Sequence, residues 1–182
     1  MTRYYFRPMN SALHLATATP ADAAHLARHV NAAYRGDTAR QGWTTEADLL
    51  DGQRIDEAGV AEMLALPGAT MLLARTEAGE LLGSFHAQIK GPVVYLSMLA
   101  VTPTLQARGV GRFLLEAAES YGRQHSCTIS RMTVISVRAE LIAYYERRGY
   151  HRTGATESFP TDPRFGLPKQ PLVLLVLEKA LG

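Results

Sequence analysis

The sequence has almost no cysteine. Cys127 is the single one among 182 residues, so no disulfide can form within the chain, and a cysteine-rich zinc site is excluded. No apolar run approaches the roughly 20 residues that a transmembrane helix requires, and no clean apolar stretch follows Arg3 and Arg7 as it would in a signal peptide. We therefore expect a cytoplasmic protein without a membrane partner.

An excess of charge of one sign is also missing. The chain has 19 basic and 17 acidic residues, a formal net charge of +2, and its longest basic run is the pair Arg147-Arg148. This balance gives no support to a nucleic-acid partner. The residues that are present, 47% hydrophobic and 20% charged, suffice for a full hydrophobic core. We expect an N-terminal arm at 1–12 and one domain at 13–182.

Hydrophobic periodicity predicts a series of strands and helices. The expected strands are 13–17, 70–75, 81–89, 94–101, 130–135, 150–154 and 172–177, and the expected helices are 20–36, 56–66, 109–124 and 138–148. The last strand is apolar throughout, which predicts burial on both faces, whereas 42–56 and 155–170 look irregular. His25 and His29 lie four apart on the first helix, but a solvated face explains them better than a metal site. The order predicts an α/β (α+β) fold, a mixed central sheet of about six to seven strands flanked by about four helices.

The stretch from the strand at 96–101 to the following helix is the most informative part of the chain. Pro103 stops the apolar strand, and the helix carries one apolar stripe. Between them, Gly109 and Gly111 have no Cβ, so a ligand could approach the backbone closely. The first helical turn also offers unpaired N–H groups and a positive dipole end. Together these features predict an anion site, for which phosphate is the usual occupant.

The residues around this turn decide which phosphate ligand fits. A Rossmann fingerprint needs a third glycine where Leu114 stands, and a Walker loop needs Gly-Lys-Ser/Thr where Arg112 follows Gly111. The remaining pattern, Gln106-x-x-Gly109-x-Gly111 after an apolar strand, resembles the pyrophosphate motif of the Gcn5-related N-acetyltransferases (GNAT), which bind acetyl-CoA. A glycine turn that binds nothing is the alternative for this motif alone.

A second motif has the same resemblance. Tyr145 lies on a predicted helix, four residues before the pair Gly149-Tyr150 and about 40 residues after the glycine turn, as in the second hallmark of the GNAT family. Two motifs in the right order are more specific than either one, although Tyr145 alone would be read as a packed helix aromatic. Arg138 departs from the family, which often has Asn near the start of this helix. We expect Arg138 to lie in solvent or in a surface ion pair. The alternative is contact with a CoA phosphate or a substrate carboxylate, which would add Arg138 to the cofactor-binding residues.

The resemblance implies the GNAT acyl-CoA N-acyltransferase fold. It implies an N-acetyltransferase that moves the acetyl group of acetyl-CoA to a primary amine of a small molecule or peptide, by direct attack and with coenzyme A as product. It also implies the cofactor-binding residues, which are the backbone of Met98, Leu99, Ala100 and Val101 for the pantetheine arm, and Gln106, Ala107, Arg108, Gly109, Val110, Gly111 and Arg112 for the pyrophosphate. Tyr145 is then the acid for the departing thiolate, and Cys127 is structural. The alternative to an enzyme is a non-catalytic acyl-CoA sensor with this fold. Leu114 disfavours a third interpretation, a nucleotide-binding module. A homodimer is possible as the oligomeric state.

The motifs do not define the general base. The central strand has no carboxylate, so we consider His86, on the polar face of the strand at 81–89. A solvent-facing histidine is the equal alternative, and Glu46, Asp48 and water relays are weaker candidates.

The acceptor is also undefined. The resemblance places acceptor selection in 33–54 and 155–170, where Trp43 and Phe165 either wall a pocket or, by default, pack in the core. Neither segment has a charge run that would indicate a polycationic or polyanionic acceptor.

Overall fold

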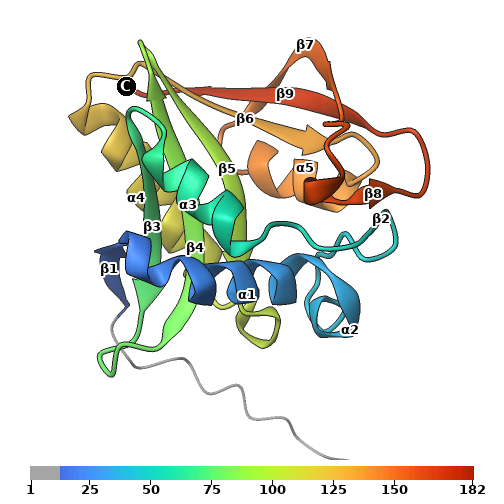
Figure 1. The fold of residues 1–182 in the computed structure, drawn as a ribbon. Helices are drawn as coiled ribbons and strands as arrows, with labels where there is room; N and C mark the ends of the chain where they lie inside the picture. Colours follow the sequence, from blue (N-terminus) through green and yellow to red (C-terminus); the bar gives the residue numbers. More distant parts are fainter. Residues whose placement is uncertain (1–12) are drawn as a thin grey trace, which may run out of the picture.

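The computed structural model describes residues 13–182, so the expected arm at 1–12 lies outside the described residues. Its centre is a seven-stranded mixed sheet in the order β1-β3-β4-β5-β6-β9-β7 (Figure 1). The strands are β1 (His14–Thr17), β3 (Ala69–Arg75), β4 (Leu81–Lys90), β5 (Val93–Val101), β6 (Ile129–Ile135), β7 (His151–Ser158) and β9 (Val173–Ala180). A separate small sheet pairs β2 (Leu50–Asp51) with β8 (Leu167–Pro168). The predicted fold class is confirmed.

Helices cover both faces of the large sheet. α1 (Ala23–Tyr34) and α3 (Glu57–Ala65) pack on one face, and α4 (Val110–Gln124) and α5 (Ala139–Glu146) pack on the other (Figure 1). The short helical elements are α2 (Gly36–Ala39) and the 3-10 turns Pro20–Asp22, Pro103–Leu105 and Pro163–Phe165. The first helical segment begins with a capping box, in which the Thr19 N–H donates to Asp22 Oδ2 at 2.8 Å. Within residues 13–182, no helix is long and apolar enough to cross a membrane.

The sheet opens between β5 and β6. In the described part of the chain, their parallel ladder ends at Leu96 and Met132. Beyond it β5 forms a bulge, because Met98 has a φ of 59° and the pairing with β4 shifts register beside it. A backbone of this kind costs about 1–3 kcal/mol, so the surrounding packing must hold it. The two strands diverge toward α5 (Figure 1), and this opening positions the site.

Two expectations for the last part of the chain are wrong. β9 is not buried on both faces, since Val173 is 43% exposed and only Val176 and Leu177 within the strand are fully buried. β7 pairs with the start of β9, at Ser158 and Val173, and is itself exposed along its whole length, so this edge of the sheet is not covered by other elements. The segment 155–170 is also more ordered than expected, because β7 extends to Ser158 and β8 pairs with β2.

Candidate active site

Two cavities meet at the opening between β5 and β6. The first, of about 490 Å³, lies beside the start of α4, and we call it the glycine-turn cavity. The second, of about 390 Å³, lies between β5, β6 and the loop around Phe165, and we call it the strand cavity. Five residues line both cavities, namely Tyr34, Leu99, Arg138, Leu141 and Tyr145. They form a border at which two bound ligands would touch.

The glycine turn has the conformation that its sequence predicts. Gly109 caps α4 with a φ of 93°, in the left-handed region that favours glycine, and Ala107 just before it has a φ of 62°. Position 111 favours glycine for another reason, because a Cβ there would lie 3.1 Å from the Tyr144 hydroxyl oxygen. The turn therefore presents backbone N–H groups to the glycine-turn cavity, and the α4 dipole adds to their attraction for an anion.

The polar side chains of the turn have different neighbours. Gln106 lines the cavity, but its Oε1 also accepts a hydrogen bond from the Thr44 N–H at 3.4 Å, which ties the turn to the loop before β2. Arg112 lines the cavity from an exposed position and pairs with Glu116 at 2.7 Å, one helical turn away. Arg108 is exposed and lies outside the cavity wall. An arriving phosphate would meet Arg112 more readily than Arg108.

The bulged part of β5 forms the inner wall of the site. Leu99 and Val101 line the glycine-turn cavity, and Met98 lines the strand cavity. Ala100 lies between them and packs toward α1 and α3, so its backbone is the only part near the site. The Tyr34 hydroxyl donates to the Leu99 carbonyl at 2.8 Å, and burial raises the pKa of Tyr34 to about 12, which keeps this donor protonated. This bond holds the bulge in place.

Tyr145 lies at the border between the cavities. Its side chain is buried, and its ring makes edge contacts with Tyr144 at 5.3 Å and Tyr150 at 5.8 Å between centroids. Burial is the main cause that raises the pKa of Tyr145 well above its usual value. The hydroxyl is therefore protonated at neutral pH and can donate a hydrogen bond.

Three further residues belong to the glycine-turn cavity, of which Tyr144 and Arg148 were not predicted from the sequence and Trp43 was considered only as a wall of an acceptor pocket. Tyr144, Trp43 and Arg148 all line the glycine-turn cavity; the Tyr144 and Trp43 rings are 5.6 Å apart, and the Arg148 guanidinium lies 3.5 Å from the Tyr144 ring centroid. The core-packing default for Trp43 is wrong, because 42% of this residue is exposed. Tyr144 and Arg148 lie within or next to the Tyr145 motif, and this position in the sequence was the only indication that they belong to the site.

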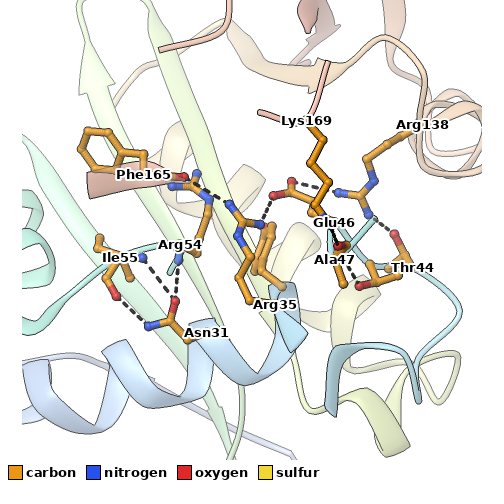
Figure 2. Close-up of polar contacts among 12 residues, drawn as sticks. Asn31, Arg35, Thr44, Glu46, Ala47, Arg54, Ile55, Arg138, Phe165 and Lys169 are labelled. Carbon is orange, nitrogen blue, oxygen red and sulfur yellow. Dashed lines mark hydrogen bonds and ion pairs between the residues drawn. The ribbon is translucent and has the colours of Figure 1, made fainter. Parts of the chain in front are cut away.

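The prediction of a solvated Arg138 is wrong. Arg138 is only 6% exposed, and it donates to Glu46 Oε1 at 3.1 Å and to the Thr44 hydroxyl. The other carboxylate oxygen of Glu46 forms an ion pair with the Arg35 guanidinium at 2.5 Å, as Figure 2 shows. Arg35 also donates to the Phe165 carbonyl at 3.1 Å. This buried cluster, the Arg35–Glu46–Arg138 triad, joins α1, the loop before β2, the start of α5 and the late loop.

The triad also changes the ranking of the base candidates. Glu46 is buried rather than a surface charge, and both of its oxygens are committed to arginines, so neither oxygen is free to contact a substrate amine. Asp48 is exposed and pairs with Arg40 at 2.7 Å. Neither carboxylate is placed as a base.

His86 is buried, so the solvent-facing alternative is wrong. The polar face of β4 does not face water because α1 and α3 cover it; His86 is 2% exposed, and burial lowers its pKa to about 4. Its Nδ1 lies 2.9 Å from the Ser97 hydroxyl, and Ser97, not His86, lines the strand cavity. The base role of His86 stays a prediction, and any contact with a ligand would run through Ser97. Within residues 13–182, no cluster of side chains suited to a metal is present.

Comparison with known proteins points to one family. Residues 38–160 match the family model described as "Acetyltransferase (GNAT) domain", and no curated protein has significant sequence similarity to the chain. Among similar structures, the ribosomal-protein-S18-alanine N-acetyltransferase from Escherichia coli is 16% identical, with a TM-score of 0.68 over 94% of this chain and 95% of that one. The ribosomal-protein-alanine N-acetyltransferase from Brucella melitensis is 21% identical, with a TM-score of 0.67 over 93% and 100%. YncA from Salmonella typhimurium, solved with its cofactor acetyl-CoA, is 22% identical, with a TM-score of 0.67 over 94% and 95%.

Proposed function

The chain belongs to the GNAT acetyltransferase family, and from this premise we propose that it transfers the acetyl group of acetyl-CoA to a primary amine of a small molecule or peptide. The amine nitrogen bonds to the acetyl carbon, and the carbon–sulfur bond breaks. One proton leaves the amine nitrogen and one proton reaches the sulfur, so the products are an N-acetyl amine and coenzyme A. The proposal includes a cytoplasmic location, where the lone Cys127 thiol stays reduced; a homodimer stays a prediction.

One observation carries the proposal. Tyr145, a buried and protonated hydroxyl, lines both cavities where β5 and β6 separate. A transfer between two substrates needs both reacting atoms within reach of one another. The border between the glycine-turn cavity and the strand cavity offers that place.

The residues of the glycine-turn cavity fit acetyl-CoA. The backbone N–H groups at 109–111 and the start of α4 suit a pyrophosphate, and the cavity wall adds the cations Arg112, Arg147 and Arg148. Beyond Leu96, β5 no longer pairs with β6, so its free edge can hydrogen-bond an extended pantetheine arm. An N–H at the bulge is suited to polarise a thioester carbonyl there. When bound, acetyl-CoA supplies the activated acetyl group.

Tyr145 acts on the leaving sulfur. A free thiol has a pKa of about 8.5, below that of a buried tyrosine, so full proton transfer to an isolated thiolate would be uphill. A thiolate formed in the same buried place would have a raised pKa for the same reason as Tyr145. Tyr145 therefore stabilises the sulfur with a hydrogen bond as negative charge develops and delivers the proton as the bond breaks.

We assign uptake of the amine proton to Ser97 and His86, with water as the other acceptor. Ser97 lines the strand cavity, and its hydroxyl lies 2.9 Å from His86 Nδ1. With a pKa of about 4, His86 is neutral at pH 7 and holds a proton only transiently, so the proton returns through Ser97 to water.

A panel of primary amines tests the proposal, with release of the coenzyme A thiol as the measurement. We expect release that depends on both the amine and acetyl-CoA, and acetyl-CoA should raise the melting temperature because it binds the native state. Acetyl-CoA binding without release for any amine would support the acyl-CoA sensor instead. Release of the coenzyme A thiol without formation of an N-acetyl amine would contradict direct transfer.

A further inference from the structure

Arg54 is an uncommitted cation in the wall of the strand cavity. Within residues 13–182 its guanidinium makes no ion pair or hydrogen bond, and its nearest aromatic partner is the Tyr34 ring, 5.6 Å away. Its backbone N–H donates to Asn31 Oδ1 at 2.5 Å, and this bond fixes the start of the side chain. Figure 2 shows that side chain extending away from α1. An arginine held in this way can bind an incoming anion with little rearrangement.

The other charges of this wall do not neutralise Arg54. Arg138 is committed to Glu46, to Thr44 and, at 3.7 Å, to Glu140, so the two arginines of the triad face two carboxylates and Arg54 stays outside these pairs. Glu157, on β7, lines the cavity from an exposed position and forms no ion pair within the described residues. The inner part of the strand cavity therefore favours one negative charge, and Glu157 at the rim disfavours a second one.

The rest of the wall is largely apolar. Its members include Phe85, Tyr95, Met132, Phe159, Phe165 and Leu174. A ligand that matches this lining has an apolar body and a single polar group placed at Arg54.

We infer that the acceptor is an amino acid with an apolar side chain, whose carboxylate Arg54 binds while its amine faces the border with the glycine-turn cavity. This inference rests on the proposed acetyl transfer and narrows its substrate class. A planar carboxylate accepts two parallel hydrogen bonds from a guanidinium, so Arg54 selects acceptors that carry an acid group next to the amine. A peptide amide or a simple alkylamine lacks that group.

Matched ligands test the inference in the full chain loaded with coenzyme A. The probes are L-phenylalanine, L-phenylalaninamide and phenethylamine, with the corresponding three forms of L-leucine, and calorimetry gives their Kd values. We expect at least one of the two amino acids to bind about tenfold to a hundredfold more tightly than its amide and its amine. Arg54→Gln should remove this preference, and Arg54→Lys should keep part of it. Arg28→Gln, the same change on the exposed face of α1, is the control and should leave it intact.

The outcomes separate this inference from the proposed function. The inference would be overturned if both amino acids bound no more tightly than their amides. It would also be overturned if the Arg54→Gln variant kept the preference for the amino acid. Acetylation of the amide and the amine but not of the amino acid would keep the proposed function and overturn the inference. Binding selective for the carboxylate, without thiol release from acetyl-CoA, would keep the carboxylate site at Arg54 and overturn the proposed function.

Discussion

Glu46 holds the buried triad together, so its charge should matter greatly for stability. Glu46→Gln keeps the volume and leaves Arg35, with a side chain 7% exposed, without a counter-charge, while Arg138 keeps only Glu140, 3.7 Å away and 49% exposed. Removing one partner of a buried ion pair costs about 3–5 kcal/mol, because the remaining charge stays desolvated. In a chain of this size 1 kcal/mol shifts Tm by about 2–4 °C, so Tm should fall by about 6–20 °C.

Denaturant unfolding and thermal melting of the same samples give the free energy of unfolding and Tm. Glu62→Gln is the matched control, since Glu62 pairs with Arg164 at 3.3 Å but is 62% exposed. An exposed pair contributes about 0–1 kcal/mol, so this variant should resemble the parent.

A double variant shows whether the loss comes from the triad. Glu46→Gln with Arg138→Gln should cost less than the sum of the single changes by about 1–3 kcal/mol, because the second change removes one uncompensated charge. A Glu46→Gln loss below about 1 kcal/mol, or additive effects in the double variant, would refute the reasoning.

Two further predictions concern the glycine turn and the buried histidine. Gly111→Asp should abolish the rise in Tm that acetyl-CoA causes, since it places a side chain 3.1 Å from the Tyr144 hydroxyl and a negative charge at an anion site. Gly111→Ala should reduce this rise in Tm less. An unchanged acetyl-CoA affinity in Gly111→Asp would mean that the turn binds nothing. His86 has a pKa lowered from 6.5 to about 4, so the unfolded chain binds its proton first and stability should fall as pH drops from about 6.5 to about 4. In His86→Gln that decline should be shallower. His86→Ala should also remove the acidic limb of the kcat/KM profile at constant acetyl-CoA Kd, and a profile of unchanged shape would leave water as the acceptor of the proton.

The parts of the site that depend on local sequence were predictable. The left-handed φ of Gly109 and the close packing at Gly111 are properties of one strand–turn–helix segment, and the residue pattern of that segment contains them. Tyr145 was found for a similar reason, since its spacing from Gly149 lies within one helix and its cap. Periodicity also defined the strands of the central sheet, because the side chains of a half-buried strand alternate.

The parts that depend on distant contacts were not predictable. Arg138 and Glu46 are 92 residues apart, and neither has a local pattern that marks it as buried or paired. His86 was placed on the correct face of its strand, but the burial of that face depends on α1 and α3. Arg54 lies in a segment without periodicity, and only the assembled cavity shows that its charge has no partner among the described residues.

The central claim is that Tyr145 assists departure of the sulfur at the border of the two cavities. Tyr145→Phe removes one oxygen and keeps the buried ring, so the fold and the acetyl-CoA Kd should be unchanged. Tyr121→Phe, the same change on α4 away from both cavities, is the control.

Single-turnover transfer to the best amine of the panel is the most direct measurement, because product release cannot hide the chemical step. General acids contribute about 10²- to 10⁴-fold, and we expect a loss near the lower value, since a thiolate leaves fairly well without help. A rate in Tyr145→Phe that equals the parent's, with fold and Kd intact, would contradict the account and show that Tyr145 only packs.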